Sequence, residues 1–286
     1  MLTAKELVKD AVGLVSLPDI YIRLRSLLDR PDYGLAEVGV LIGQDPGLTA
    51  RLLHLVNSAY FGVAARIETV SRAVNMLGTQ QVHDLVLATS VAETFSDMST
   101  GVMHMRTYWE GSIRCGVMAR LLAIHCNMLD SERLFVAGLL RDIGHLLMYQ
   151  KYPGPSQKAL IRATQAQELV FRVERELFGF DYAQVGGELA GLWNLPPALE
   201  SSIRYHTVPA RADEFRLEAS IIHLASVVTE THRWTGNGEK WVECADPIAL
   251  QLTDLSVETV DHLLVEAGDQ VASTVDLILP NLREIS

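Results

Sequence analysis

Apolar residues recur at intervals of three and four positions along most of the chain, a spacing typical of amphipathic helices. The clearest case begins at Pro46, where Asp45 is placed to cap the helix and Leu48, Leu52 and Leu55 form its apolar stripe. In the first hundred residues, helices are predicted at 2–15, 18–28, 35–42, 46–61, 67–77 and 79–95. Because no strand-like alternation of useful length occurs among them, the pattern predicts an all-α protein.

The second half of the chain continues this pattern after a polar linker at 96–107. Helices are predicted at 109–124, 134–147, 156–178, 181–193, 196–206, 214–234, 247–253, 257–267 and 269–279, with a loop at 235–246. The linker divides the chain into an N-terminal helical lobe, residues 1–98, packed on a second helical lobe, residues 99–235. The C-terminal helices of residues 236–286 are expected to cover the second lobe.

One polar dipeptide, Arg141–Asp142, interrupts the otherwise apolar segment 134–147. Arginine and aspartate are rarely buried without a partner, because an isolated charge is costly to remove from water. Asp142 and Glu110 are the candidate partners of Arg141. The alternative is that the Arg141 side chain extends to the surface.

Two stretches resemble a known family. The motifs that keep the order and spacing of the start of an HDOD domain are Leu17-Pro18, Asp45-Pro46, Asn57-Ser58-Ala59, Ile67 and Leu77-Gly78. The segment around Arg141 resembles the signature helix of the related HD metal-dependent phosphohydrolases, in which a His-Asp dipeptide binds a divalent metal. Arg141 stands where that histidine would be. The resemblance implies an HDOD region of about residues 14–212, a second lobe that is a degenerate HD-like lobe, and a role in bacterial signal transduction.

The resemblance also locates six positions of the HD metal site in this sequence. They are Gly111, Arg141, Asp142, Tyr182, His206 and Ser226. Only Asp142 and His206 keep a metal-binding side chain, whereas a catalytic metal needs about three protein ligands. A permanently charged Arg141 in the pocket would repel a metal by roughly 4 kcal/mol per unit of metal charge at 4 Å. We therefore expect no metal, no cofactor and no catalytic residue, and we interpret these positions as a vestigial pocket.

Asn57 and Ser58 are expected to satisfy nearby backbone groups at a helix end, with a ligand or partner contact as the alternative. Two dipeptides, His83-Asp84 and Asp261-His262, match the HD pattern by letter only and are predicted at the surface.

Two further histidines are candidates for the interior. His223 is predicted to be a hydrogen-bonded core residue, because Ile222 and Leu224 flank it. The His145 side chain is predicted to pack against its neighbours or to cap a helix, although its spacing from Asp142 would also allow the two residues to share a metal.

Composition narrows the possible functions. A formal net charge of −11 argues against a nucleic-acid-binding face, which would show clustered lysine and arginine. Cys115, Cys126 and Cys244 form no CxxC pair, which favours buried thiols in a reducing compartment. No apolar run is long enough for a membrane helix or a signal peptide, so we expect a cytoplasmic protein that neither enters a membrane nor binds nucleic acid.

Three hypotheses follow from these observations. The first is a non-catalytic signalling module that acts through signalling proteins supplied in trans. The second is a regulatory module that holds a nucleotide-like anion in the vestigial pocket, with Arg141 as a contact. The third is a residual metal-dependent phosphohydrolase.

Overall fold

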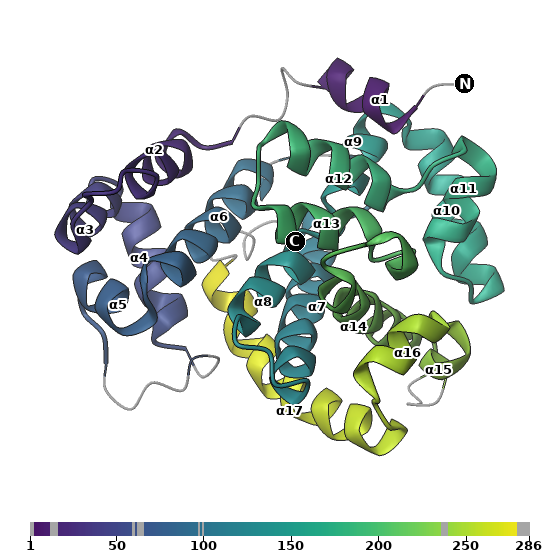
Figure 1. Cartoon of the computed structure of the whole chain (residues 1–286). Coiled ribbons are helices and arrows are strands. Elements are labelled where there is room, and N and C mark those ends of the chain that lie inside the picture. Colours follow the sequence, from purple (N-terminus) through teal and green to yellow (C-terminus); the bar gives the residue numbers. More distant parts are fainter. Residues whose placement is uncertain are drawn as a thin grey trace. The chain divides into compact units, whose positions relative to one another are not determined.

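The computed structural model describes residues 3–11, 17–58, 61, 66–96, 98, 100–235 and 240–278. Every regular element within these ranges is helical (Figure 1), which confirms the predicted all-α class. No helix in the described ranges is long and apolar enough to cross a membrane. The chain divides into a larger unit, Met1–Ser16 with Ser99–Ala267, and a smaller unit, Leu17–Met98 with Gly268–Ser286. The predicted lobe boundaries and the packing of one lobe on the other stay predictions.

The smaller unit is built around one central helix. Its other helices are α2 Asp19–Leu28, α3 Leu35–Gly43, α4 Pro46–Val56 and α5 Val70–Leu77, and α2, α4 and α5 all pack against α6 Thr79–Ser96. The Asp45 carboxylate caps α4 as predicted, since its Oδ1 accepts the Leu48 N–H at 2.9 Å. Gly78, at φ +87°, ends α5 as predicted.

The surface prediction for His83 and Asp84 is wrong, because both side chains are buried. They lie on α6, and a central helix is covered on more than one face, so its polar positions are buried too. Inside this core, the His83 ring stacks on Tyr21 at 4.7 Å between centroids, and Gln80 donates a hydrogen bond to Asp84 at 2.9 Å. The exposed position predicted for Asp261 and His262 is confirmed.

The larger unit places α7 Met105–His125 against α8 Ser131–Leu140 and α14 Arg216–Thr235. The next helix in the chain, α9 Ile143–Lys151, packs on α12 Tyr182–Leu192, and α12 packs on α13 Pro197–Tyr205. The remaining elements are α1 Ala4–Ala11, α10 Pro153–Ala166, α11 Val170–Phe178, η1 Pro209–Arg211, α15 Lys240–Cys244 and α16 Pro247–Thr253. The last helix, α17 Val257–Ile278, begins in the larger unit, and its residues from Gly268 onward belong to the smaller one.

Several predicted boundaries are wrong. The segment 134–147 is two helices, α8 and α9, because the backbone leaves helical geometry at Asp142, where ψ is 3°. The segment 156–178 divides into α10 and α11 at Gln167, which adopts a left-handed φ of +50°. The predicted loop 235–246 contains the short helix α15, and the segments 257–267 and 269–279 form one helix, α17.

Close helix packing fixes the direction of α9. Gly144 lies directly against the backbone of α12, and a Cβ atom at this position would collide with the Tyr182 carbonyl and the Gly186 N–H. Because α8 packs on α7 while α9 packs on α12, the chain must turn between them, and the turn falls at Arg141 and Asp142.

Candidate functional site

Arg141 occupies the corner between α8 and α9, and its guanidinium is held by three protein groups. Its Nη2 forms an ion pair with Asp142 Oδ2 at 2.8 Å, its Nε donates to Ser226 Oγ at 3.2 Å, and its Nη1 donates to the Gly138 carbonyl at 3.2 Å. The side chain is only 4% exposed, so the predicted partner Asp142 is confirmed and the surface alternative is wrong. The other candidate partner, Glu110, instead pairs with Arg106 at 2.8 Å.

His206 and Tyr182 form a buried pair whose proton positions follow from their neighbours. His206 Nδ1 lies 2.9 Å from the Ile203 carbonyl, which can only accept, so Nδ1 carries the proton. His206 Nε2 must then accept the hydrogen bond from the Tyr182 hydroxyl at 3.1 Å. Burial, followed by the nearby charge of Arg141, lowers the pKa of His206 to about 3. His206 is therefore a neutral imidazole with both nitrogens engaged.

His223 extends this arrangement and confirms the prediction of a hydrogen-bonded core histidine. Its Nδ1 donates to the His206 carbonyl at 2.8 Å, and its Nε2 accepts the Asp246 N–H at 2.8 Å. Burial is the main reason that the pKa of His223 falls to about 4.

His145 is tied to a buried carboxylate. Its Nε2 lies 2.9 Å from Glu174 Oε1, and Glu174 also accepts the Tyr182 N–H at 2.9 Å. The imidazole stacks on the rings of Tyr149 and Tyr182, at 5.0 and 4.0 Å between centroids. Burial alone would lower the pKa of His145, but the Glu174 carboxylate outweighs it and raises the pKa. The packing role predicted for His145 is confirmed.

A pocket of about 300 Å³ opens beside this network, and Gly111, Arg141 and Asp142 line it. Ser226 contacts Arg141 directly, and the charge of Arg141 reaches Tyr182 and His206. The structure thus gathers the six positions located by resemblance into one region of the larger unit.

Glu230 also lines this pocket, and it was missed in the sequence analysis. Burial, and then the Asp142 carboxylate, raise the pKa of Glu230 to about 7. A sequence signal was present, since Glu230 follows Ser226 by four residues on α14 and so lies on the same helix face.

This set of donors does not fit a divalent metal. Asp142 is engaged by the Arg141 guanidinium, and neither nitrogen of His206 is free to coordinate. Within the part of the chain that the structure describes, no three side chains of His, Cys, Asp or Glu are grouped so that they could hold a metal ion.

Asn57 and Ser58 lie in the smaller unit. Asn57 Nδ2 donates to the Leu53 and Ile67 carbonyls at 2.7 Å each, and Asn57 Oδ1 accepts the Ile67 N–H at 2.7 Å. Ser58 Oγ donates to the Leu55 carbonyl at 2.7 Å. The predicted backbone hydrogen bonding is confirmed, and a ligand or partner contact at these two residues stays a prediction.

The thiols follow the sequence interpretation in part. Cys115 is fully buried, whereas Cys126 and Cys244 are half-buried, and all three are free. Burial raises the pKa of the Cys115 thiol to about 12, so Cys115 is an inert core residue.

Comparison with known proteins gives a consistent result. Residues 14–209 match the HDOD domain family. An uncharacterized protein of Treponema pallidum (strain Nichols) is 27% identical over 225 residues, which cover 74% of this chain and 41% of that protein. The chain therefore spans less than half the length of that relative.

Solved structures share the fold over nearly the whole chain. An HDOD domain protein of unknown function from Geobacter sulfurreducens has a TM-score of 0.75 at 22% identity, covering 96% of this chain and 98% of that one. A candidate phosphohydrolase from Shewanella amazonensis SB2B has a TM-score of 0.74 at 23% identity, covering 95% and 97%. A candidate signal transduction protein from Marinobacter aquaeolei VT8 has a TM-score of 0.69 at 23% identity, covering 95% and 61%. At these identities the likeness shows the fold alone.

Proposed function

Because the chain belongs to the HDOD domain family, we propose that it is a bacterial signal-transduction module that acts through protein partners and does not hydrolyse phosphate esters. The observation that carries the proposal is the buried Arg141–Asp142 ion pair at the corner between α8 and α9. One structural neighbour is named as a candidate signal transduction protein, which supports the same class of function.

The argument against hydrolysis is chemical. Phosphate-ester hydrolysis in HD enzymes depends on a divalent metal that polarises the phosphate and lowers the pKa of a bound water. In this chain the Arg141 guanidinium lies where a metal ligand would be needed, and it engages the carboxylate of Asp142. A guanidinium can hydrogen-bond to water but has no coordination site, so it cannot lower the pKa of a bound water as a metal does.

Two observations favour this proposal over an anion held by Arg141 in the vestigial pocket. Three of the five guanidinium N–H groups already have protein partners, so at most two are left for an anion. Asp142 and Glu230 also line the pocket, and their carboxyl groups would repel a phosphate.

The test has two arms. The purified protein is loaded with Mn²⁺, dialysed and analysed for metal content, and its hydrolysis of cyclic dinucleotides and of a generic aryl phosphate is measured. Arg141→His is the control variant, since it restores an imidazole and returns the dipeptide to His-Asp. Wild type is expected to retain less than stoichiometric metal and to show no turnover above buffer. Stoichiometric Mn²⁺ together with turnover that EDTA abolishes would contradict the proposal.

The second arm concerns partners. Affinity capture from the source bacterium, with the wild-type chain as bait, is expected to recover specific signalling proteins in near-stoichiometric amounts. The control bait is a sample that was unfolded in urea and has not regained its tertiary packing. Capture of the same proteins by both samples would show that the recovered proteins bind nonspecifically and would count against a partner-binding role.

A further inference from the structure

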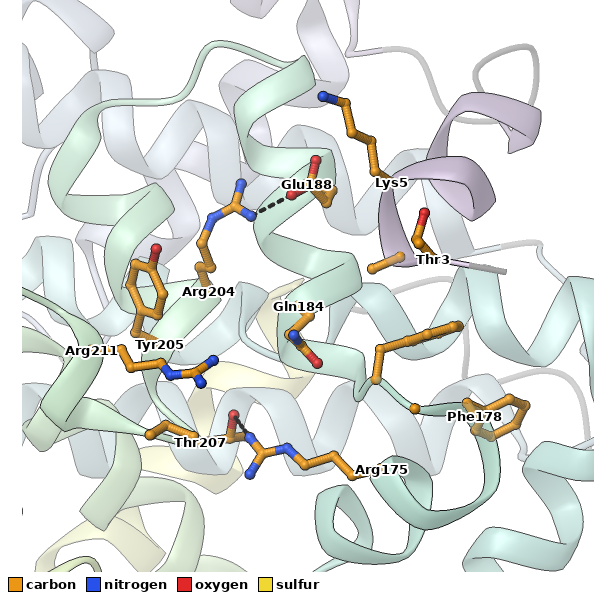
Figure 2. A pocket seen from close by; sticks show the side chains of 14 residues that line it. Thr3, Lys5, Arg175, Phe178, Gln184, Glu188, Arg204, Tyr205, Thr207 and Arg211 are labelled. Atoms are coloured by element: carbon orange, nitrogen blue, oxygen red, sulfur yellow. Dashed lines mark hydrogen bonds and ion pairs between the residues drawn. The ribbon is translucent and has the colours of Figure 1, made fainter. Parts of the chain in front are cut away.

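A second cavity, of about 850 Å³, lies in the larger unit and shares no lining residue with the vestigial pocket. Figure 2 shows side chains of α1, α11, α12 and α13 surrounding it. Four basic residues line it, namely Lys5, Arg175, Arg204 and Arg211, and Glu188 is the one acidic residue of the lining. The whole chain has 35 acidic residues against 24 basic ones, so the lining of this cavity is richer in basic residues than the chain as a whole.

Two of the arginines are fixed in place by the protein. Arg175 is bonded to Asp181, a fully buried carboxylate, through its Nε at 2.7 Å, and its Nη2 donates to Thr207 Oγ1 at 2.9 Å. Arg204 donates through Nη1 to Glu188 at 2.5 Å and through Nη2 to Glu200 at 3.0 Å. Such contacts hold each guanidinium in one orientation, which reduces the entropy lost when a ligand binds.

The other two cations supply charge that no carboxylate neutralises. Lys5 and Arg211 are exposed, and neither has an ion-pair partner among the residues that the structure describes. They reach the cavity from opposite parts of the larger unit, Lys5 from the start of α1 and Arg211 from η1. A ligand between them would therefore meet positive charge from two sides.

We propose that this cavity binds a small phosphate-bearing ligand. Arginine and lysine are the side chains that recognise phosphate oxygens, and the side-chain NH2 group of Gln184 adds a hydrogen-bond donor. The rings of Phe178 and Tyr205 offer an apolar wall for an organic part of the ligand. The volume lies within the range of about 300–1,000 Å³ that is typical of small-molecule sites.

A ligand in this cavity would contact residues that are linked through the chain to the buried network beside the vestigial pocket. The cavity wall and its support include Arg175, Asp181 and Thr207, and each of them is the chain neighbour of a residue in that network. The corresponding network residues are Glu174, Tyr182 and His206. This inference goes beyond the proposed function, because it supplies a ligand as the input to the module and does not depend on whether the module is catalytic.

Isothermal titration calorimetry of the full chain tests the proposal, with inorganic pyrophosphate and the ribonucleoside diphosphates as probes. The test variant is Lys5→Ala/Arg211→Ala, which removes the two unpaired charges. The matched control is Arg72→Ala/Lys158→Ala, which removes the same charge from exposed positions outside the cavity. A third variant, Arg141→Met/Asp142→Asn, removes the cation of the vestigial pocket together with the carboxylate that it neutralises. Circular dichroism and the melting temperature establish that each variant is folded.

We expect at least one probe to bind wild type and the matched control with equal affinity. Removal of Lys5 and Arg211 should weaken that binding about tenfold or more, since two charged donors to the phosphate oxygens are lost. Binding should weaken with added salt and persist in Arg141→Met/Asp142→Asn. The proposal is overturned if no probe binds, if Lys5→Ala/Arg211→Ala binds like wild type, or if folded Arg141→Met/Asp142→Asn does not bind.

Discussion

Replacing Arg141 by methionine should strongly destabilise the larger unit. Methionine approximates the length of the arginine stem but removes the guanidinium, so Asp142 loses its ion-pair partner and Ser226 and Gly138 each lose a donor. Removing one partner of a buried ion pair costs about 3–5 kcal/mol, because the remaining charge is left unneutralised. Asp142 is 15% exposed, which favours the lower end of that range.

The two lost hydrogen bonds add about 1 kcal/mol each. The expected total is therefore about 5 kcal/mol, a large share of the roughly 5–15 kcal/mol that stabilises a typical protein. Combining Arg141→Met with Asp142→Asn removes the stranded carboxylate. This double variant should recover about 2–3 kcal/mol of the loss, because the unneutralised charge is its largest part.

Urea unfolding followed by tryptophan fluorescence measures these differences. All four tryptophans, Trp109, Trp193, Trp234 and Trp241, lie in the larger unit, so the signal reports the unit that contains Arg141. A loss of less than about 1 kcal/mol in the single variant would refute the reasoning. So would a double variant no more stable than the single one, since the cost would then lie in packing and not in charge.

Four further outcomes are expected. Gly144→Ala should lower the free energy of unfolding by about 3 kcal/mol or more, measured through the melting temperature, because the added methyl meets the backbone of α12. The control Gly154→Ala, whose methyl meets nothing within 4 Å, should be neutral or slightly stabilising. The pKa of His206 is lowered in the folded protein, so the unfolded chain binds more protons below about pH 6.5, and the free energy of unfolding should fall as the pH drops from there. His206→Gln should flatten this part of the dependence of stability on pH, measured by urea unfolding. The pKa of Glu230 is raised, so stability should fall as the pH rises from about 4.5 through 7, and Glu230→Gln should be more stable than wild type at pH 8 in the same melts. Asn57→Ala should cost about 2 kcal/mol and expose the Ile67 amide to hydrogen exchange, since three hydrogen bonds of 2.7 Å are lost.

Helical periodicity was sufficient to predict the fold class and most helices, because the apolar stripes that define them are local in sequence. The pairing of Arg141 with Asp142 was also predictable, since a buried cation requires an anion nearby. The break between α8 and α9 was not, because it depends on α9 meeting α12 at Gly144, a contact between distant segments. Periodicity read this segment as one helix because both halves are equally apolar.

Burial was harder to predict than helicity. His83 and Asp84 read as a polar face, and only the position of α6 at the centre of its unit shows that this face is covered. Glu230 has an ordinary place on a helix in the sequence, and its raised pKa arises from Asp142, which lies nearly ninety residues earlier in the chain. Groups whose chemistry depends on such long-range neighbours could not be assigned from the sequence alone.

The corner between α8 and α9 requires a positive charge whether or not the module is catalytic. Asp142 and Glu230 both line the pocket, and Asp142 already raises the pKa of Glu230 even with Arg141 in place. Without a cation, the two carboxyl groups would repel each other, and the buried corner would be destabilised. A divalent metal could meet that need in a relative, and Arg141 meets it here through one ion pair and two directional hydrogen bonds. We infer that an arginine at this position preserves the architecture because its guanidinium supplies the positive charge that a bound metal would supply there. The structural likeness to a candidate phosphohydrolase, at 23% identity, therefore shows the fold alone, and the metal and hydrolysis assays decide the activity of this chain.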